Sequence, residues 1–292
     1  MINDGRTNFL YLADTLKQKH PEFFSHFTTL LKQHKINFAL LPGTKDIWAR
    51  DYMPIQNSLG EFIRFMYTPD YLQSKKQAET ITDSGPVCEK IGIETRPSEI
   101  ILDGGNVIHH GSKIILCDKI IRENPTIQKK ELTEQLRWLL RANQVIYIPI
   151  PSDDIFGHAD GVVRFVKSNL VFINNYSGKD IKFREVLINV LNKSKIKFIE
   201  LPYNPYKNKT HLDATGIYIN YLEVGKVIFV PVYGMKEDEE ALEIFRKVFS
   251  KKVIVPVRSN SIAKQGGVLN CISWNLKIKN SKQFFFNLLV QT

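Results

Sequence analysis

A cysteine close to the end of the chain is the first candidate for chemistry. Cys271 follows the pair Gly266-Gly267 and opens a stretch rich in β-forming residues. Glycines allow a tight bend, and a thiolate exposed at such a bend can reach a ligand. A cysteine standing alone is more often a small buried hydrophobic residue. The rest of the chain must therefore supply the partners that a catalytic thiol requires.

Two polar loops contain suitable partners. Asp51 ends the segment WARD, and His158 and Asp160 lie within the segment GHADG. Residues two apart in an extended segment face the same way, so His158 and Asp160 are expected to point into one space. The alternatives are a surface ion pair between Arg50 and Asp51 and a purely structural histidine.

Together these side chains suit a planar cation. Two carboxylates can accept the forked N–H donors of a guanidinium group and hold its central carbon still. Cys271 would attack that carbon, while His158 passes a proton to the departing nitrogen and later takes one from water. The bound cation would itself favour the thiolate. This set predicts a cysteine-dependent enzyme that acts on a guanidine compound.

Other polar residues are weaker candidates. Asp103 begins the segment DGGN, which is either part of the site or simply a turn, because Asp, Gly and Asn are turn formers. The adjacent His109 and His110 would face opposite sides of a strand, so we expect no metal site there. His211 and Asp213 repeat the two-residue spacing without flanking glycines and are interpreted as structural.

The elements that must position these loops form a repeat. Each copy has a helical segment, a short apolar strand ending near a proline, a polar loop and a β-hairpin. Helices are expected near residues 21–34, 75–91, 128–142, 183–192 and 238–249, and strands over residues 37–41, 145–150, 197–201 and 252–255. The loop markers Asp51, Asp103, His158, Asp213 and Cys271 lie 52, 55, 55 and 58 residues apart.

This near-equal spacing predicts an α/β fold of ββαβ-type units arranged about an axis, with the five loops at one end. The N-terminal strand and helix would complete the last unit, so residues 1–292 would form one domain with a central cleft. The alternative is an unrelated α/β protein whose loops are similarly spaced by coincidence. The tail, residues 280–292, is interpreted as a final edge strand or a capping segment.

Composition narrows the classes of partner. The chain has 292 residues, 43% hydrophobic and 24% charged, as in ordinary globular proteins. Its net charge of +10 would suit an anionic partner, but the lysines are scattered, so a solvated surface is favoured over nucleic-acid binding. We find neither a signal-peptide pattern nor an apolar stretch long enough for a membrane span, so a cytoplasmic protein is expected. The oligomeric state is open, and a homo-oligomer is compatible with the sequence.

The other cysteines and the short motifs indicate no cofactor. Cys88 and Cys117 lie in apolar surroundings and are expected in the core. Three cysteines without CxxC spacing indicate neither a disulfide framework nor a structural zinc site, and a reducing compartment fits them best. The chain also lacks a GxGxxG segment or another phosphate-binding loop.

At these loops the chain resembles the agmatine deiminase and bacterial-type peptidylarginine deiminase family of the guanidine-modifying, or pentein, superfamily. Five segments carry the resemblance, in the order that the family has them. They are residues 48–54 (WARDYMP), 102–106 (LDGGN), 156–161 (FGHADG), 218–221 (YINY) and 266–273 (GGVLNCIS). Each segment is weak alone, but five in order are specific.

The resemblance implies a five-bladed α/β propeller and hydrolysis of a guanidine to a ureido group and ammonia, without cofactor or metal. It assigns guanidinium binding to Asp51 and Asp160, general acid/base catalysis to His158, and the covalent amidino-thioether intermediate to Cys271. The further substrate-binding residues that it implies are Trp48, Asp103 and Asn220.

Two departures from the family pattern leave the substrate open. The family usually has Glu where this chain has Asp103, and His where it has Asn270. Agmatine is the first substrate expected, with peptidylarginine or free arginine as alternatives. Free arginine would need a cation for its carboxylate, and Arg50, Arg164 and Arg258 are candidates. An amidinotransferase using the same residues and a non-catalytic guanidine or polyamine binder are the competing functions.

Overall fold

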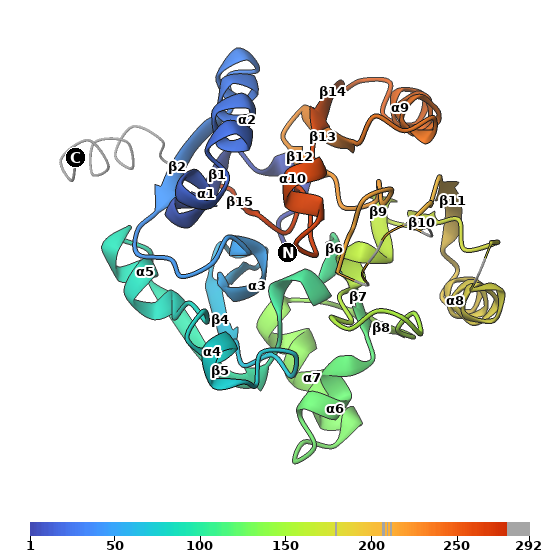
Figure 1. Ribbon diagram of the computed structural model, residues 1–292. Helices are drawn as coiled ribbons and strands as arrows, with labels where there is room; N and C mark the ends of the chain where they lie inside the picture. Colours follow the sequence, from blue (N-terminus) through green and yellow to red (C-terminus); the bar gives the residue numbers. More distant parts are fainter. Residues whose placement is uncertain (179, 206–207, 209, 211, 279–292) are drawn as a thin grey trace.

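Five three-stranded sheets form the frame of the molecule. The computed structural model describes residues 1–278, except residues 179, 206–207, 209 and 211. The five sheets surround a central axis like blades, and the longer helices lie at the periphery (Figure 1). The chain is therefore an α/β propeller of five blades, as the repeat predicted. The C-terminal tail and His211 lie outside the described residues.

All five sheets share one topology. The first strand of each sheet pairs antiparallel with the second, and the second pairs parallel with the third. The sheets are β3 (Ile55–Gln56), β4 (Phe62–Met66) and β5 (Thr95–Ile101); β6 (Ile108–His110), β7 (Lys113–Cys117) and β8 (Gln144–Ile148); β9 (Val163–Lys167), β10 (Leu170–Asn174) and β11 (Lys197–Leu201); β12 (Leu222–Val224), β13 (Val227–Val232) and β14 (Val253–Arg258); and β15 (Ser273–Leu276), β1 (Phe9–Ala13) and β2 (Asn37–Leu41).

The last sheet joins the two ends of the described chain. Strand β15 pairs antiparallel with β1, and β1 pairs parallel with β2. The N-terminal segment thus completes the fifth unit, as expected. All five residues of β1 are buried because strands flank it on both edges and side chains cover both of its faces.

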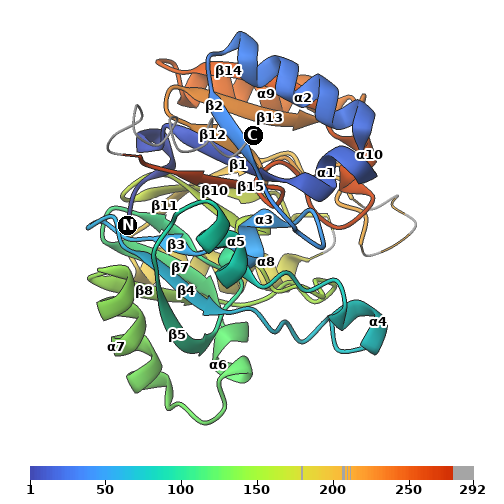
Figure 2. The same ribbon diagram turned by 90° about the vertical axis from the view of Figure 1, so that its left-hand side faces the viewer.

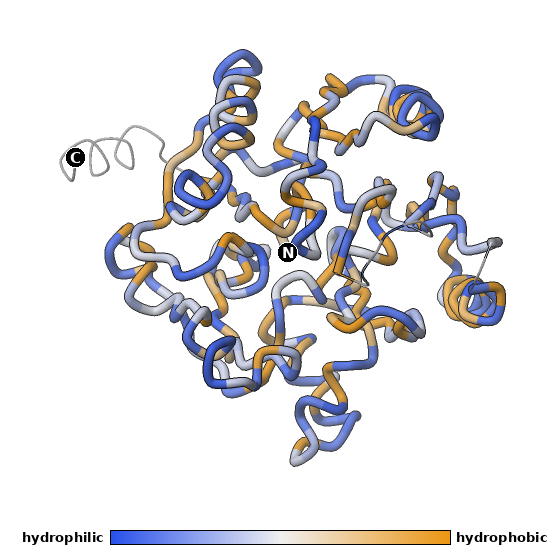
Figure 3. The backbone as a smooth tube through the Cα atoms, viewed as in Figure 1, coloured by the Kyte–Doolittle hydropathy of each residue, from blue (hydrophilic) through white to orange (hydrophobic). Residues whose placement is uncertain are grey.

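Helices connect the second and third strand of each unit. They are α1 (Asp14–Lys19) and α2 (Pro21–Gln33), α4 (Lys75–Ala78) and α5 (Ser84–Lys90), α6 (Lys119–Glu123) and α7 (Lys129–Leu140), α8 (Ile181–Lys193), and α9 (Glu237–Val248). In α2 the buried Phe23, Phe27 and Leu31 recur every four residues, which gives the helix one apolar face. Figure 3 shows both apolar and polar colours on these peripheral helices.

Helices α2, α5 and α9 pack against the sheet of the preceding unit, which interlocks the ring. Phe27 of α2 lies edge-on to Phe229 of β13, with ring centroids 5.5 Å apart. Phe245 of α9 contacts Phe172 of β10 with the rings tilted and their centroids 5.2 Å apart. Cys88 of α5 is buried in the cluster that contains β1. Figure 2 shows the resulting stack of blades from the side.

Some expected boundaries were wrong for identifiable reasons. The single helix expected over residues 75–91 is two helices, because Ser74 and Asp83 each cap a separate start. Pro97 and Pro256 lie inside β5 and β14 rather than after them. Both strands are sheet edges, where a residue without an N–H is tolerated. In the described part of the chain, no helix is both long and apolar enough to cross a bilayer.

Candidate active site

The propeller brings one loop from every unit to the axis. Each loop ends at the first strand of a sheet and carries a polar residue a few positions before it. Asp51 lies in α3 (Ala49–Tyr52), Asp103 precedes the turn η2 (Gly104–Asn106), and His158 and Asp160 flank the start of η3 (Ala159–Gly161). Asn220 precedes β12 and Cys271 precedes β15. All six side chains are buried.

Asn220 and Asp160 surround the thiol of Cys271. The Asn220 Nδ2 group donates to Cys271 Sγ at 3.2 Å and to Asp160 Oδ2 at 3.0 Å. The same carboxylate oxygen lies 3.6 Å from Sγ. Asn220 Oδ1 accepts from the backbone N–H groups of Asn270 and Cys271. The side chain of Asn220 thus fixes both the backbone of Cys271 and the carboxylate of Asp160 beside it.

Asn270 supports the same carboxylate. Its Nδ2 group donates to Asp160 Oδ2 at 2.7 Å. Asp160 is therefore held by two amides, and its Oδ2 faces the thiol. The residue that departs from the family pattern immediately before Cys271 consequently contacts the candidate catalytic set directly.

His158 lies between two carboxylates. Its Nε2 atom is 2.8 Å from Asp103 Oδ2, and its Nδ1 atom is 3.5 Å from Asp51 Oδ1. The N–H of Gly105 donates to the same Asp51 oxygen at 3.0 Å. Because both ring nitrogens face acceptors, the doubly protonated imidazolium fits this position.

Two glycines permit these close approaches. A Cβ atom on Gly105 would lie 2.5 Å from Asp51 Oδ1 and 2.9 Å from His158 Nδ1. A Cβ atom on Gly267 would lie 2.6 Å from Trp48 Cζ3 and 3.1 Å from Cys271 Sγ. No other amino acid fits at either position without moving the neighbouring site residues.

The electrostatics of the site follow from burial and crowded carboxylates. Burial, with Asp160 and Asp51 nearby, raises the pKa of the Cys271 thiol well above its usual value. Burial and neighbouring carboxylates likewise raise the pKa of Asp51 to about 7. Burial alone would lower the pKa of His158, but Asp51 and Asp103 outweigh it and raise that pKa to about 9. The unliganded site thus holds an imidazolium and a protonated thiol and is poised to accept a cation.

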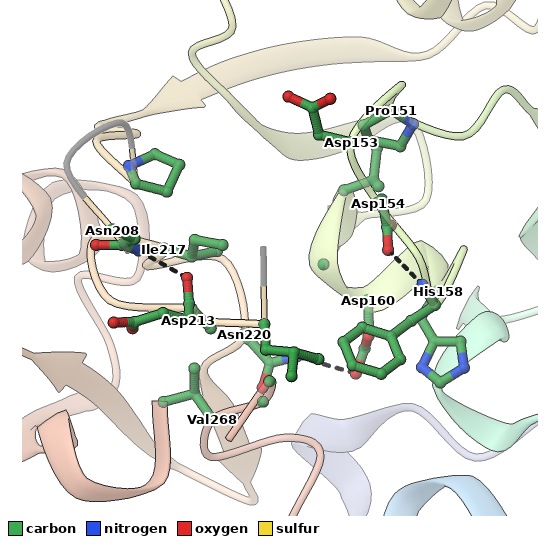
Figure 4. Close-up of a pocket in the computed structure, with 18 of the residues that line it drawn as sticks. Pro151, Asp153, Asp154, His158, Asp160, Asn208, Asp213, Ile217, Asn220 and Val268 are labelled. Carbon is green, nitrogen blue, oxygen red and sulfur yellow. Dashed lines mark hydrogen bonds between the residues drawn. The ribbon is translucent and has the colours of Figure 1, made fainter. Parts of the chain in front are cut away.

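A cavity of about 250 Å³ opens onto these groups. His158, Asp160, Asn220 and Cys271 line its inner end. Figure 4 shows Asp153 and Asp154 on one wall and Asp213 on the other, beside Asn208. The marker residue of the fourth loop, Asp213, therefore belongs to the cavity wall, whereas Asn220 of that unit reaches the thiol.

The other residues that sequence reasoning selected do not line this cavity. Trp48 packs beside Gly267, close to the loop that carries Cys271. Asp51 and Asp103 contact the two ring nitrogens of His158. Arg50 donates to Asn275 and the Asn270 carbonyl, so it forms no surface ion pair with Asp51.

Sequence reasoning missed Lys119 and Tyr71, which both contact Asp103. Neither residue lies in a recognisable motif. Cys88 and Cys117 are buried, as expected. Among the described residues, no group of three or more His, Cys, Asp and Glu side chains is arranged to hold a metal ion. Cys271, His158 and Asp160 line one cavity, whereas Asp51 contacts His158 without lining it. A thiol, an imidazolium and a carboxylate at such a cavity can bind a planar cation and transfer protons to and from it.

Fold and site together define a five-bladed α/β propeller with a buried Cys, His and Asp cluster at its axis. Residues 11–276 match the family model of the Porphyromonas-type peptidyl-arginine deiminase. The chain therefore belongs to this family of guanidine-modifying deiminases, which are hydrolases acting on amidines.

Individual relatives are distant. A predicted agmatine deiminase of Selenomonas ruminantium is 25% identical, over 83% of this chain and 77% of the relative. The agmatine deiminase of Pseudomonas aeruginosa (strain LESB58) is 21% identical, over 61% of this chain and 57% of its own length. This second match therefore spans less than two thirds of the relative.

Solved structures share the fold. The C. jejuni agmatine deiminase superposes with a TM-score of 0.77 at 18% identity, covering 96% of both chains. The more remote DDAH from Pseudomonas aeruginosa has a TM-score of 0.57 at 10% identity, over 92% of this chain and 99% of that one. These likenesses establish the pentein architecture.

Proposed function

We propose that this chain is a single-domain deiminase that hydrolyses a guanidine group to a ureido group and ammonia through a covalent intermediate on Cys271. The observation that carries the proposal is the contact of Cys271 Sγ with Asn220 and Asp160, in a cavity that His158 also lines. Asp51 and Asp160 would accept the guanidinium N–H groups. Trp48, Asp103 and Asn220 would shape the surrounding site.

The first half of the reaction forms the thioether. The bound cation lowers the pKa of the thiol, which releases its proton to solvent, and the resulting thiolate attacks the central guanidinium carbon, forming the S–C bond. One C–N bond then breaks, and the His158 imidazolium gives its proton to the departing nitrogen, which leaves as ammonia. The raised pKa of His158, about 9, keeps this proton available at neutral pH.

The second half consumes one water molecule. The now neutral His158 takes a proton from water, and the oxygen attacks the amidino carbon. The S–C bond breaks, the sulfur leaves as thiolate, and the ureido product forms. The imidazolium is restored, so one guanidinium and one water give one ureido group and one ammonium ion.

The charge of the cavity supports agmatine as the substrate. Asp153, Asp154, Asp180 and Asp213 are the carboxylates that line the described part of its wall away from the thiol. These groups favour a tail that ends in an ammonium over one that carries a carboxylate. The C. jejuni relative is itself an agmatine deiminase that has been solved with substrate bound.

Arg50 and Arg164, two candidates for binding a substrate carboxylate, lie outside the cavity that contains Cys271. Arg164 donates to Asp4 and to the backbone of Tyr221. Arg50 and Arg164 line a separate cavity of about 50 Å³. Neither lines the cavity that contains Cys271, which supports agmatine over free arginine.

The test is a substrate screen with purified protein. Ammonia and ureido product are measured with agmatine, arginine, methylated arginines and an arginyl peptide. We expect the highest kcat/KM with agmatine and no turnover in Cys271→Ala, whose folding is checked by circular dichroism. An added amine acceptor, such as ornithine, should not become guanidinylated. Release of neither product from any of these substrates would refute the proposal.

A further inference from the structure

A buried lysine stands behind the candidate catalytic histidine. Lys119 begins α6 and is only 2% exposed. Its ammonium lies 3.0 Å from Asp103 Oδ2, 3.1 Å from Glu123 Oε1 and 3.2 Å from Asp70 Oδ1. It also lies 4.6 Å from the centre of the Tyr71 ring. A buried ammonium is costly unless carboxylates compensate it, and here three carboxylates surround it.

Lys119 reaches His158 through Asp103 and, less directly, through Tyr71, whose hydroxyl lies 3.4 Å from His158 Nε2. It does not line the cavity that holds Cys271. Its aliphatic stem packs beside Gly157, the residue before His158. Asp103 Oδ2 is the atom on which Lys119 and His158 converge, at 3.0 and 2.8 Å. Lys119 therefore acts on the imidazole through a shared oxygen rather than on a substrate.

The shared oxygen is crowded, whereas the other carboxylate oxygen is free. The Tyr71 hydroxyl donates to Asp103 Oδ2 at 3.4 Å and lies 3.4 Å from His158 Nε2. Asp103 Oδ1 is buried and has no hydrogen-bond partner among the described residues. The Asp103 carboxylate is thus held through Oδ2, and the two charged donors to that oxygen are Lys119 and His158. Without the ammonium, the carboxylate would keep the His158 contact and the longer Tyr71 contact but lose its second charged donor.

Charge acts in the same direction. Burial alone would favour the protonated acid, but His158 and Lys119 outweigh it and lower the pKa of Asp103. The other charged and titratable groups that face this pair are Asp51, Asp70, Tyr71, Glu123, Asp154 and Asp160. Among the described groups around Asp103 and His158, Lys119 is the one permanently charged cation, and the others are mostly carboxylates.

We propose that Lys119 is a positioning residue for the deiminase reaction: its ammonium fixes the Asp103 carboxylate, ionised and turned toward His158 Nε2, and so orients the imidazole for proton transfer. This inference rests on the proposed function. It adds a residue outside the cavity to the machinery and predicts that Lys119 and Asp103 act as one unit.

The experiment compares Lys119→Met, Asp103→Asn and the double variant. We expect kcat with agmatine to fall about 10- to 100-fold in each single variant, a fraction of what proton transfer contributes, with KM within about threefold. The double variant should be no more than about threefold worse than the weaker single variant, because the two residues form one unit. The proposal would be overturned if the loss of kcat in the double variant equalled the product of the two single losses. It would also be overturned if kcat of Lys119→Met stayed within threefold of wild type.

A second readout does not depend on turnover. The His158 Nε2–H proton, protected by its 2.8 Å hydrogen bond, should give a downfield proton NMR signal, assigned by its loss in His158→Gln. The signal should broaden or vanish in Lys119→Met and Asp103→Asn. An unchanged signal in Lys119→Met would contradict the proposal even if no substrate were found, so failure of the two proposals can be told apart.

A control variant tests whether the position matters. Lys129 also lies over a tyrosine ring, 5.0 Å from the centre of Tyr147, but it is exposed and begins α7. Lys129→Met should leave kcat and the NMR signal unchanged. If Lys119→Met does not fold, Lys119→Met/Glu123→Gln, which removes one uncompensated carboxylate, is judged by the same criteria. Loss of folding in both would indicate a structural role and overturn the proposal.

Discussion

A single methyl group added at Gly105 should disable the site although no candidate catalytic side chain is replaced. In Gly105→Ala the new Cβ atom would lie 2.5 Å from Asp51 Oδ1, whereas ordinary contacts begin at 3.4 Å. The carboxylate oxygen must therefore move by about 3.4 − 2.5 = 0.9 Å. His158 Nδ1, at 2.9 Å, must move as well. A displacement of this size at a reacting group costs about 10²-fold in rate.

The assay is ammonia release from agmatine, measured as kcat/KM. We expect kcat/KM to fall about 100-fold in Gly105→Ala. The free energy of unfolding should fall by no more than about 1–3 kcal/mol, the usual cost of overpacking, so the protein should remain folded. Gly161→Ala is the control, because its added methyl group meets nothing within 4 Å and its loss should not exceed about threefold. Full activity in folded Gly105→Ala would refute the geometry described for Asp51 and His158.

Three further predictions concern charge. The kcat/KM should rise with pH through about 7, where Asp51 ionises, and fall through about 9, where His158 loses its proton; a flat profile from pH 6 to 10 would contradict the assignment. Asp213→Asn should lower kcat/KM for agmatine about fivefold, equivalent to ~1 kcal/mol, but leave that for butylguanidine unchanged; equal losses would argue against tail recognition. Chloroacetamidine is a cation and should alkylate Cys271 much faster than neutral iodoacetamide, because the pKa of the thiol is raised and a bound cation lowers it. Equal rates would exclude ionisation of the thiol by a bound cation.

Much of the fold could be predicted because it repeats. Strands β2 and β11 have the predicted bounds, and the helices near α2, α7, α8 and α9 agree to within a few residues. Local signals sufficed there, since apolar periodicity and turn residues recur in each unit. The sequence predicted α4 and α5 as one helix because Ser74 and Asp83 were not recognised as the caps of two separate helices.

The contacts of the site were less predictable. Hydrophobic periodicity cannot show that His158 lies against both Asp51 and Asp103, because these contacts depend on how neighbouring blades are packed. Lys119 carried no sequence signal, since a lysine after a strand is usually solvated. Only the packing of α6 against the loops reveals that it is buried and charge-compensated.

The most direct test of the central claim is mass spectrometry of Cys271 during turnover. The protein is mixed with agmatine, quenched with acid within the first turnovers and digested. The peptide that contains Cys271 should carry the mass of the substrate less ammonia, and this adduct should disappear after substrate is exhausted and be absent from Cys271→Ala. Formation of the ureido product without any adduct on Cys271, or by the Cys271→Ala protein, would contradict the account.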